Sequence, residues 1–220
     1  LTSIIFLSGT SGGNVTYNWT SDIEIGAGLS GTGDMNFTAT NLTTAPIVAT
    51  ITVTPVFENG GVTNEGDSVS FTITVNPAAE VDQPNDEVFC ASEFAVINFT
   101  TSNTVGTTTY DWENSNTAIG LTNLNGSGNS ITFTTTNTGT TPITSTLIVT
   151  PTFSYNGVDC DGPNKVFTIT VNPTGHVDDP ADEVVCNGDA TTAVSFTTNN
   201  TVGTTTYAWA NNNVSIGLGA

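Results

Sequence analysis

One stretch of the chain occurs twice almost unchanged. Residues 103–121 read NTVGTTTYDWENSNTAIGL, and residues 200–218 read NTVGTTTYAWANNNVSIGL. A more diverged copy, GGNVTYNW, ends at Trp19. Similarity at a fixed spacing indicates an array of equivalent units, so each unit, and not the whole chain, must be explained as a fold.

The spacing between copies is about 96 residues. The tripeptide VNP at residues 75–77 recurs 96 positions later, at residues 171–173. Trp112 and Trp209 are 97 positions apart, so the spacing varies slightly along the unit. Small insertions of this kind are tolerated in the turns between strands. A unit of this length can bury its own core. We therefore expect an incomplete unit at residues 1–77, a complete unit at residues 78–173 and a further incomplete unit at residues 174–220.

Apolar and polar residues alternate along the complete unit, for example at residues 97–100 and 131–134. A period of two is typical of half-buried strands, and threonine suits the outward positions because it is both β-branched and polar. No apolar period of about 3.6 residues persists. The pattern predicts an all-β chain, a tandem array of immunoglobulin-like sandwiches with about seven strands each. The residues expected in the core are Ile97, Phe99, Trp112, Ile131, Phe133, Leu147, Val149, Phe167 and Ile169.

Tyr110 and Trp112 are two positions apart and therefore point to one face of a strand. A tryptophan on the third strand is a central core residue of immunoglobulin-like sandwiches, so we expect this pair in the core. The alternative is an exposed aromatic platform, in which residues 110–116 would bind a ligand such as a carbohydrate.

The charge of the chain restricts its partners. The net charge is −19, charged residues make up 10% of the chain, and Lys165 is the only Lys or Arg. Nucleic acids and anionic membranes are bound by Lys and Arg, so we expect neither as a partner. No apolar stretch is long enough to cross a bilayer, and we expect no membrane insertion in this segment. We interpret residues 1–7 as a strand and expect the secretion signal outside this segment, because no basic residue precedes their apolar run.

The complete unit contains two cysteines, Cys90 on its first expected strand and Cys160 in a hairpin before its last strand. A disulfide between them would close a loop of about 70 residues and stabilise the unit by about 4 kcal/mol. We predict this bond, with Cys186 unpaired. Disulfide use indicates an extracellular location. Because His176 is the only histidine and no Cys-x2-Cys pair occurs, we expect no metal–thiolate site.

Carboxylates recur in the connectors between units. Calcium takes about six to eight oxygen ligands, and an ion at each junction would stiffen the array. No D-x-D-x-D-G loop is present, and the alternative is a solvated acidic connector that keeps the array soluble. The candidate calcium ligands are Asp82, Asp86, Glu87, Asp178, Asp179, Asp182 and Glu183.

The sequence contains no recognisable catalytic constellation. It has one histidine and no G-x-S-x-G motif, so no set of nucleophile, base and orienting residue can be assembled. Glycoside hydrolysis needs only two carboxylates, but it also needs a cleft that small sandwiches rarely supply. Apart from calcium, we expect no cofactor, and we expect no enzymatic activity.

The Phe-Thr pair at residues 99–100, followed by Tyr-x-Trp at residues 110–112, resembles the PKD-type immunoglobulin-like domain. With its VNP, its V-D-x-P-x-D-E-V segment and its leading cysteine, the unit resembles the PKD-like tandem repeats of very large Bacteroidetes cell-surface adhesins, including SprB-type gliding adhesins. The resemblance covers the whole chain. The chain differs from the PKD motif at residues 113–115, where Glu-Asn-Ser replaces Gly-Asp-Gly.

This resemblance implies a stalk or spacer on the cell surface, exported by type IX secretion and used in gliding motility or surface attachment. Its partners would be further repeats of the same chain and a surface polysaccharide or protein ligand bound elsewhere in the parent protein. The resemblance also implies O-glycosylation of Ser68 in the tripeptide Asp-Ser-Val, although this tripeptide also arises by chance in a chain rich in Ser and Thr. The alternative function is a carbohydrate- or protein-binding sandwich module.

Overall fold

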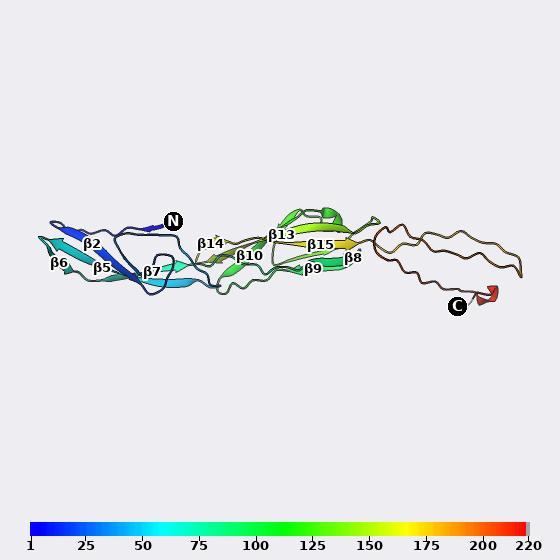
Figure 1. Cartoon of the computed structure of the whole chain (residues 1–220), viewed down its shortest axis with the longest axis horizontal. Helices are drawn as coiled ribbons and strands as arrows, with labels where there is room; N and C mark the ends of the chain where they lie inside the picture. The colour runs from blue at the N-terminus through cyan, green and yellow to red at the C-terminus, as the bar shows by residue number, and fades with distance from the viewer. Residues whose placement is uncertain (219–220) are drawn as a thin grey trace.

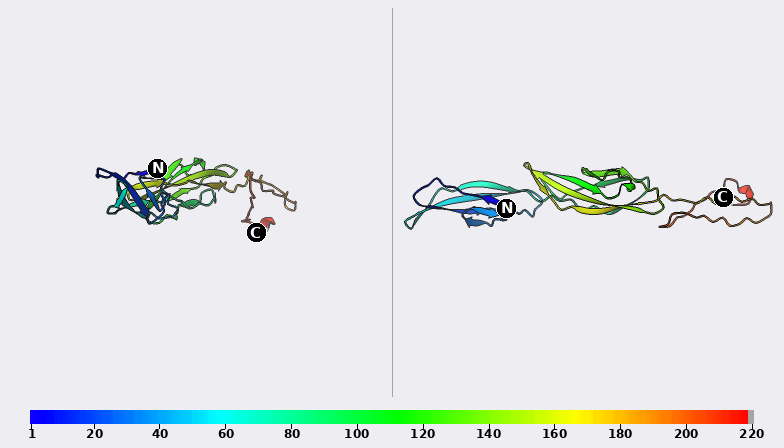
Figure 2. Two further views of the ribbon diagram at one scale, coloured as in Figure 1. Left: turned by 60° about the vertical axis from the view of Figure 1, so that its left-hand side comes forward. Right: turned by 90° about the horizontal axis from the view of Figure 1, so that it is seen from above.

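The computed structural model describes residues 1–218 as an elongated chain of β-structure (Figure 1). Two units lie end to end along the long axis, and the view from above shows the same order (Figure 2, right). Each unit has its own hydrophobic cluster of buried residues, one between Trp19 and Val75 and the other between Val81 and Val171. Separate cores are what the repeated sequence predicts.

The first unit contains a larger and a smaller sheet. The larger has the order β3-β2-β5-β6 with β7 also paired to β5, and the smaller is the pair β1-β4; all of its pairings are antiparallel. Its strands are β1 (Thr2–Ile4), β2 (Asn14–Ser21), β3 (Ser30–Thr32), β4 (Met35–Phe37), β5 (Ile47–Asn59), β6 (Val62–Glu65) and β7 (Val69–Val75).

The second unit repeats this layout and adds a strand at its start. Its larger sheet has the order β11-β10-β13-β15-β8 with β14 paired to β13, and its smaller sheet is the pair β12-β9. Only β8 and β15 pair in parallel. Its elements are β8 (Glu87–Cys90), β9 (Phe94–Asn98), β10 (Thr107–Asn114), the 3-10 turn η1 (Thr117–Ile119), β11 (Asn125–Ser127), β12 (Ser130–Thr134), β13 (Ile143–Tyr155), β14 (Val158–Asp161) and β15 (Lys165–Asn172).

The second unit therefore has eight strands where the sequence pattern predicts seven. Residues 162–164, Gly-Pro-Asn, separate β14 from β15, and both of these strands pair with β13. The first unit has the equivalent break, because residues 66–68 separate β6 from β7.

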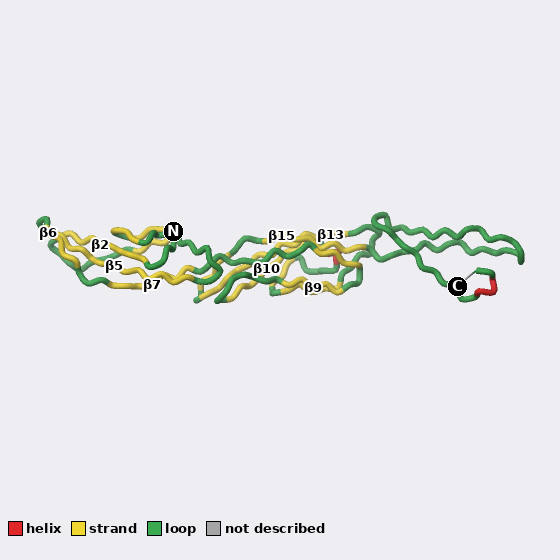
Figure 3. Tube along the Cα trace, turned by 60° about the horizontal axis from the view of Figure 1, so that its bottom comes forward, coloured by secondary structure: helices red, strands yellow, loops and turns green. Residues whose placement is uncertain are grey.

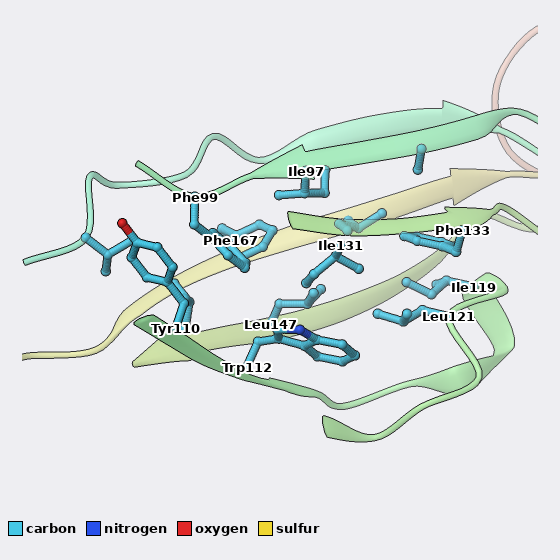
Figure 4. Packing of buried hydrophobic residues seen from close by; sticks show 14 of the residues in the cluster. Ile97, Phe99, Tyr110, Trp112, Ile119, Leu121, Ile131, Phe133, Leu147 and Phe167 are labelled. Atoms are coloured by element: carbon cyan, nitrogen blue, oxygen red, sulfur yellow. The ribbon is translucent and has the colours of Figure 1, made fainter. Parts of the chain in front are cut away.

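The core of the second unit confirms the predicted alternation. Tyr110 and Trp112 are 4% and 7% exposed, and their rings pack inward rather than forming a platform (Figure 4). The ring of Phe99 lies 5.6 Å from that of Tyr110 and 6.3 Å from that of Phe167, measured between centroids. All nine predicted core residues are buried: Ile97, Phe99, Trp112, Ile131, Phe133, Leu147, Val149, Phe167 and Ile169.

A glycine beside the buried tryptophan is common to both units. Trp112 lies opposite Gly126 on β11, and Trp19 lies opposite Gly31 on β3. In both places a Cβ atom on the glycine would overlap the indole ring. Residues 125–127 therefore form a short edge strand, in which Gly126 leaves room for the tryptophan ring.

Residues 173–218 contain no strand, only the 3-10 turn η2 (Val214–Ile216) (Figure 3). They correspond to the part of the unit that precedes β11, and within the described chain no later segment supplies equivalents of β12, β13 and β15. Trp209, the equivalent of Trp112, is consequently 56% exposed. Across residues 1–218, no helix has the length and apolar character needed to cross a membrane.

Candidate functional site at the joint between units

The predicted ligand-binding loop, residues 110–116, is divided between core and surface. Tyr110, Trp112 and Asn114 point inward, and burial raises the pKa of the Tyr110 hydroxyl. Asp111 and Glu113 are exposed and line a surface depression of about 430 Å³. Their equivalents are Asn and Thr in the first unit and Ala in the third, so the carboxylates here are not a general feature of the repeat.

The candidate calcium ligands in the first connector are engaged in hydrogen bonds with the protein. Asp82 accepts a bond from Thr100 Oγ1 at 2.6 Å, and Asp86 accepts one from the backbone N–H of Thr168 at 2.7 Å. Glu87 lies on β8. These bonds tie the connector to the second unit.

The second connector has related bonds. Asp178 accepts from Thr197 Oγ1 at 2.8 Å and lies 3.3 Å from His176 Nε2, and Glu183 accepts from the backbone N–H of Thr192 at 2.8 Å. Among residues 1–218, no group of three or more His, Cys, Asp or Glu side chains is placed to hold a metal ion. Within the described residues, neither connector gathers three of its candidate ligands, which also include Asp179 and Asp182, into one site. Calcium binding stays a prediction.

The predicted disulfide between Cys90 and Cys160 is wrong in this structure, where both residues and Cys186 are free thiols. Cys90 pairs with Asn172 at one end of the sandwich, whereas Cys160 pairs with Phe153 near the other end. About ten strand residues separate these positions, which is about 30 Å at the rise of a β-strand. A disulfide requires Cα atoms within about 7 Å. Both cysteines lie in one unit, but on strands that reach its opposite ends.

The connector that follows the first unit is buried on one side. Pro77, Ala79 and Val81 are buried, with Ala79 0% and Val81 3% exposed, and the intervening residues face solvent. Ala79 lies against Gly162, where a Cβ atom would overlap the Ala79 carbonyl group. The connector therefore combines a solvated acidic edge with an apolar edge that enters the second unit.

Asn103 fixes this connector through its side-chain amide. Its Nδ2 donates to Ala78 O at 3.1 Å, and its Oδ1 accepts from the backbone N–H of Glu80 at 2.7 Å. The next connector is held in a similar way, because Asn200 Nδ2 donates to Thr174 O at 3.0 Å. Equivalent asparagines in two successive units thus bind the backbone of the connector that precedes each unit.

Two further contacts join the first unit directly to the second. The backbone N–H of Thr104 donates to Thr44 O at 2.8 Å. Asn76 Nδ2 lies 3.1 Å from Tyr155 O and 3.3 Å from Val158 O, and donates to both. These carbonyls flank the predicted Asn-Gly hairpin, whose residues at 156 and 157 have φ angles of 51° and 74°. Positive φ at both positions gives the tight turn that reaches the end of the first unit.

The first of these contacts recurs at the next junction. Thr201 N donates to Thr140 O at 3.1 Å, at positions equivalent to Thr104 and Thr44. Each acceptor loop is organised by an asparagine: Asn41 Nδ2 donates to Val75 O and Asn137 Nδ2 to Val171 O, both at 2.8 Å. The joint is therefore encoded in the repeat. Sequence reasoning used VNP only as a boundary marker and assigned no role to these asparagines, although their recurrence was visible.

Comparisons with known proteins identify no family for the chain. No protein-family model matches it, and no curated protein matches it. Among solved structures, it is similar to Sidekick-1 immunoglobulin domains 1–5, with a TM-score of 0.28 and 11% sequence identity. The match covers 73% of this chain and 33% of that chain, so this chain spans about a third of the protein it matches. The topology itself shows the fold, since two sheets enclose one core and the first strand β8 pairs in parallel with the last strand β15. Each folded unit is an immunoglobulin-like β-sandwich.

Proposed function

We propose that this chain is a spacer segment of an extracellular array, in which successive sandwiches are held end to end at a repeated joint. The observation that carries the proposal is the recurrence of the same backbone bond, Thr104 to Thr44 and Thr201 to Thr140. A joint encoded in each repeat orients every unit in the same way relative to the one before it. Reach then increases with the number of repeats, and no unit needs a binding site.

The finer form of the proposal is a stalk of a very large PKD-like, SprB-type surface adhesin, used in gliding motility or surface attachment. The tandem sandwiches, the net charge of −19 and the hydroxyl-rich surface support an extracellular, cell-surface location. Ser68 is exposed and bonded to Thr54 Oγ1 at 2.7 Å, and it remains the proposed glycosylation site. The proposed partners are other repeats of the same chain, with ligand binding assigned to another part of the parent protein and no catalytic activity in this segment.

Two measurements test this proposal. Small-angle scattering of the chain should give a narrow, elongated particle whose longest dimension fits two sandwiches in line together with the extended residues 173–218. Antibodies raised against the chain should label intact source cells as strongly as opened cells. A broad distribution of inter-unit angles would contradict the spacer function, and labelling that requires opened cells would contradict the surface location.

A second candidate, a carbohydrate- or protein-binding module, is favoured by one observation. Asp111 and Glu113 line one surface depression of about 430 Å³, together with Asn125 and Ser127. These carboxylates can accept hydrogen bonds from the hydroxyl groups of a sugar. Glycan-array binding that is lost in a variant with Asp111→Asn and Glu113→Gln would favour this function over the spacer.

A further inference from the structure

The first unit has an open groove at the place where the second unit holds its connector. The groove encloses about 520 Å³ and is lined by residues 5–10 together with Tyr17, Pro55, Phe57 and Gly66. Residues 5–10 are equivalent to residues 98–103, the segment that bonds to the connector in the second unit. The two units thus offer the same surface, occupied in one and open in the other.

The contacts in the second unit show how such a groove is filled. The backbone N–H of Asp82 donates to Thr100 O at 2.8 Å, so the connector runs beside the segment that leads from β9. Val81 joins the hydrophobic core, and Ala79 packs on Gly162. An extended segment therefore inserts apolar side chains at alternate positions and leaves the carboxylates between them in solvent.

The lining of the first groove shows the effect of an open site. Phe57 is half-buried, whereas its equivalent Phe153 is 1% exposed. Tyr17 lines the groove, and its hydroxyl group is buried with no hydrogen-bond partner among residues 1–218. Gly66 is the equivalent of Gly162, and it has open space on the groove side apart from Pro55.

We propose that this groove is the binding site for a connector segment of the type Asn-Pro-x-x-x-Val-Asp, supplied by the repeat on its N-terminal side. This segment is present twice in the chain, at residues 76–82 and 172–178. Each connector then completes the core of the unit that follows it, so neighbouring units are joined by the inserted side chains as well as by the polypeptide backbone. The inference rests on the proposed spacer function, because it requires units that follow one another in an array.

A graft tests the proposal in the full chain. The sequence of residues 76–93, with Cys90→Ser, is fused directly before Leu1, which is the equivalent of Phe94. We expect amide hydrogen exchange in β2 and β5 to slow at least about tenfold, because protection factors follow the free energy of opening. The same graft carrying Val81→Asp should give little or no slowing, since its carboxylate cannot enter the apolar groove. Unchanged exchange with the first graft would overturn the proposal.

Gly66→Ala provides the matched test of where the graft binds. The nearest side-chain atom to the new methyl group is a Pro55 carbon at 3.1 Å, and Gly66 does not have a positive φ, so the ungrafted variant should fold with little change. With the graft in place, this methyl should meet the connector carbonyl, as a Cβ on Gly162 would meet that of Ala79. The slowing of exchange should therefore be lost.

The control for this substitution is Gly175→Ala, a site with open space and no positive φ, which should leave the graft effect intact. If the graft protects the Gly66→Ala chain as well as the parent chain, the connector binds elsewhere and the proposal is wrong. The readout lies inside the first unit, whereas the spacer function is read from particle length and cell labelling. Failure of one is therefore distinguishable from failure of the other.

Discussion

The first and second units have closely similar folds and differ mainly at their ends. Trp19 and Trp112 are 6% and 7% exposed, so the centres of the two sandwiches are equally well buried. Toward the ends the units diverge, because Val75 is 9% exposed where its equivalent Val171 is fully buried. The second unit has residues 78–93 in front of its core, and no described segment plays that role for the first.

This difference distinguishes what the strands of a unit bury by themselves from what the connector and β8 add. The alternating strands form the two sheets and bury the tryptophan without help from a neighbour. In the second unit, which has the connector and β8, Phe153 and Val171 are 1% and 0% exposed, and Val171 pairs with Phe89 of β8. The centre of each sandwich is thus formed by its own strands, whereas one end of the second sandwich is also covered by its connector and β8.

The largest expected effect comes from removing the centre of one unit. Trp112→Ala should lower the free energy of unfolding of the second unit by about 3–5 kcal/mol, because a large buried ring leaves a cavity. In calorimetry, the transition of the second unit should move to lower temperature while that of the first unit stays in place. Trp19→Ala should do the reverse. If both transitions moved together in each variant, the cores would not be independent.

Two equivalent phenylalanines, Phe153 and Phe57, compare the stability of the two units at the place where their burial differs. Phe153→Ala should lower the free energy of unfolding of the second unit by about 3–5 kcal/mol, because the ring is fully buried. Phe57→Ala should lower that of the first unit by distinctly less, because its ring is half-buried in the open groove. Chemical unfolding of each variant, followed by tryptophan fluorescence, gives both values. Equal losses would show that the groove does not distinguish the two units.

The joint itself should respond more weakly. Asn76→Ala removes two hydrogen bonds to the hairpin. The free energy that holds the two units in their relative orientation should fall by about 1–2 kcal/mol, since each bond contributes about 0.5–1.5 kcal/mol. Small-angle scattering should then show a wider spread of inter-unit angles. Asn172→Ala is the control, because no hairpin of a following unit lies within the described residues. A variant at Asn76 that kept the parent scattering curve would show that other contacts fix the joint.

The features that were predictable from the sequence are those set by local pattern. Alternation placed Ile131, Phe133 and Leu147 in the core because side-chain direction in a strand depends only on position along that strand. The same rule was available for the connector, where Pro77, Ala79 and Val81 also alternate, but the carboxylates between them suggested a solvated segment. The apolar edge was thus visible in the sequence and was not recognised.

The features that were not predictable depend on where strand ends meet in space. The pairing of Cys90 with Cys160 seemed reasonable because both lie in one unit, yet β8 and β14 reach opposite ends of the sandwich. The bond between Asn76 and the hairpin joins residues about 80 positions apart, and no local period encodes such a contact. Only the three-dimensional arrangement identifies the joint as the candidate site.

The smallest expected effect distinguishes two ways of holding the loop after the tryptophan strand. In the first unit, Glu24 accepts hydrogen bonds from the backbone N–H groups of Gly26 at 2.6 Å and Gly28 at 3.0 Å. The corresponding loop of the second unit uses a neutral residue, as Asn116 Oδ1 accepts from the N–H of Ala118 at 3.0 Å. The bonds from Gly28 and Gly26 lower the pKa of Glu24 below its ordinary value.

Because the pKa of Glu24 is lowered in the folded state, the free energy of unfolding of the first unit depends on pH with a definite sign. The ionised carboxylate stabilises the folded state above the ordinary pKa of glutamate, and this stabilisation is lost as the pH falls through the lower folded value. Glu24→Gln should therefore destabilise the first unit slightly at neutral pH, and the difference from the parent chain should shrink in acid. Thermal unfolding of both chains at neutral and acidic pH measures it, with the second unit as the internal reference because its loop has no carboxylate at this place. A gap that widened on acidification would mean that the neutral form of Glu24, and not its carboxylate, holds the loop.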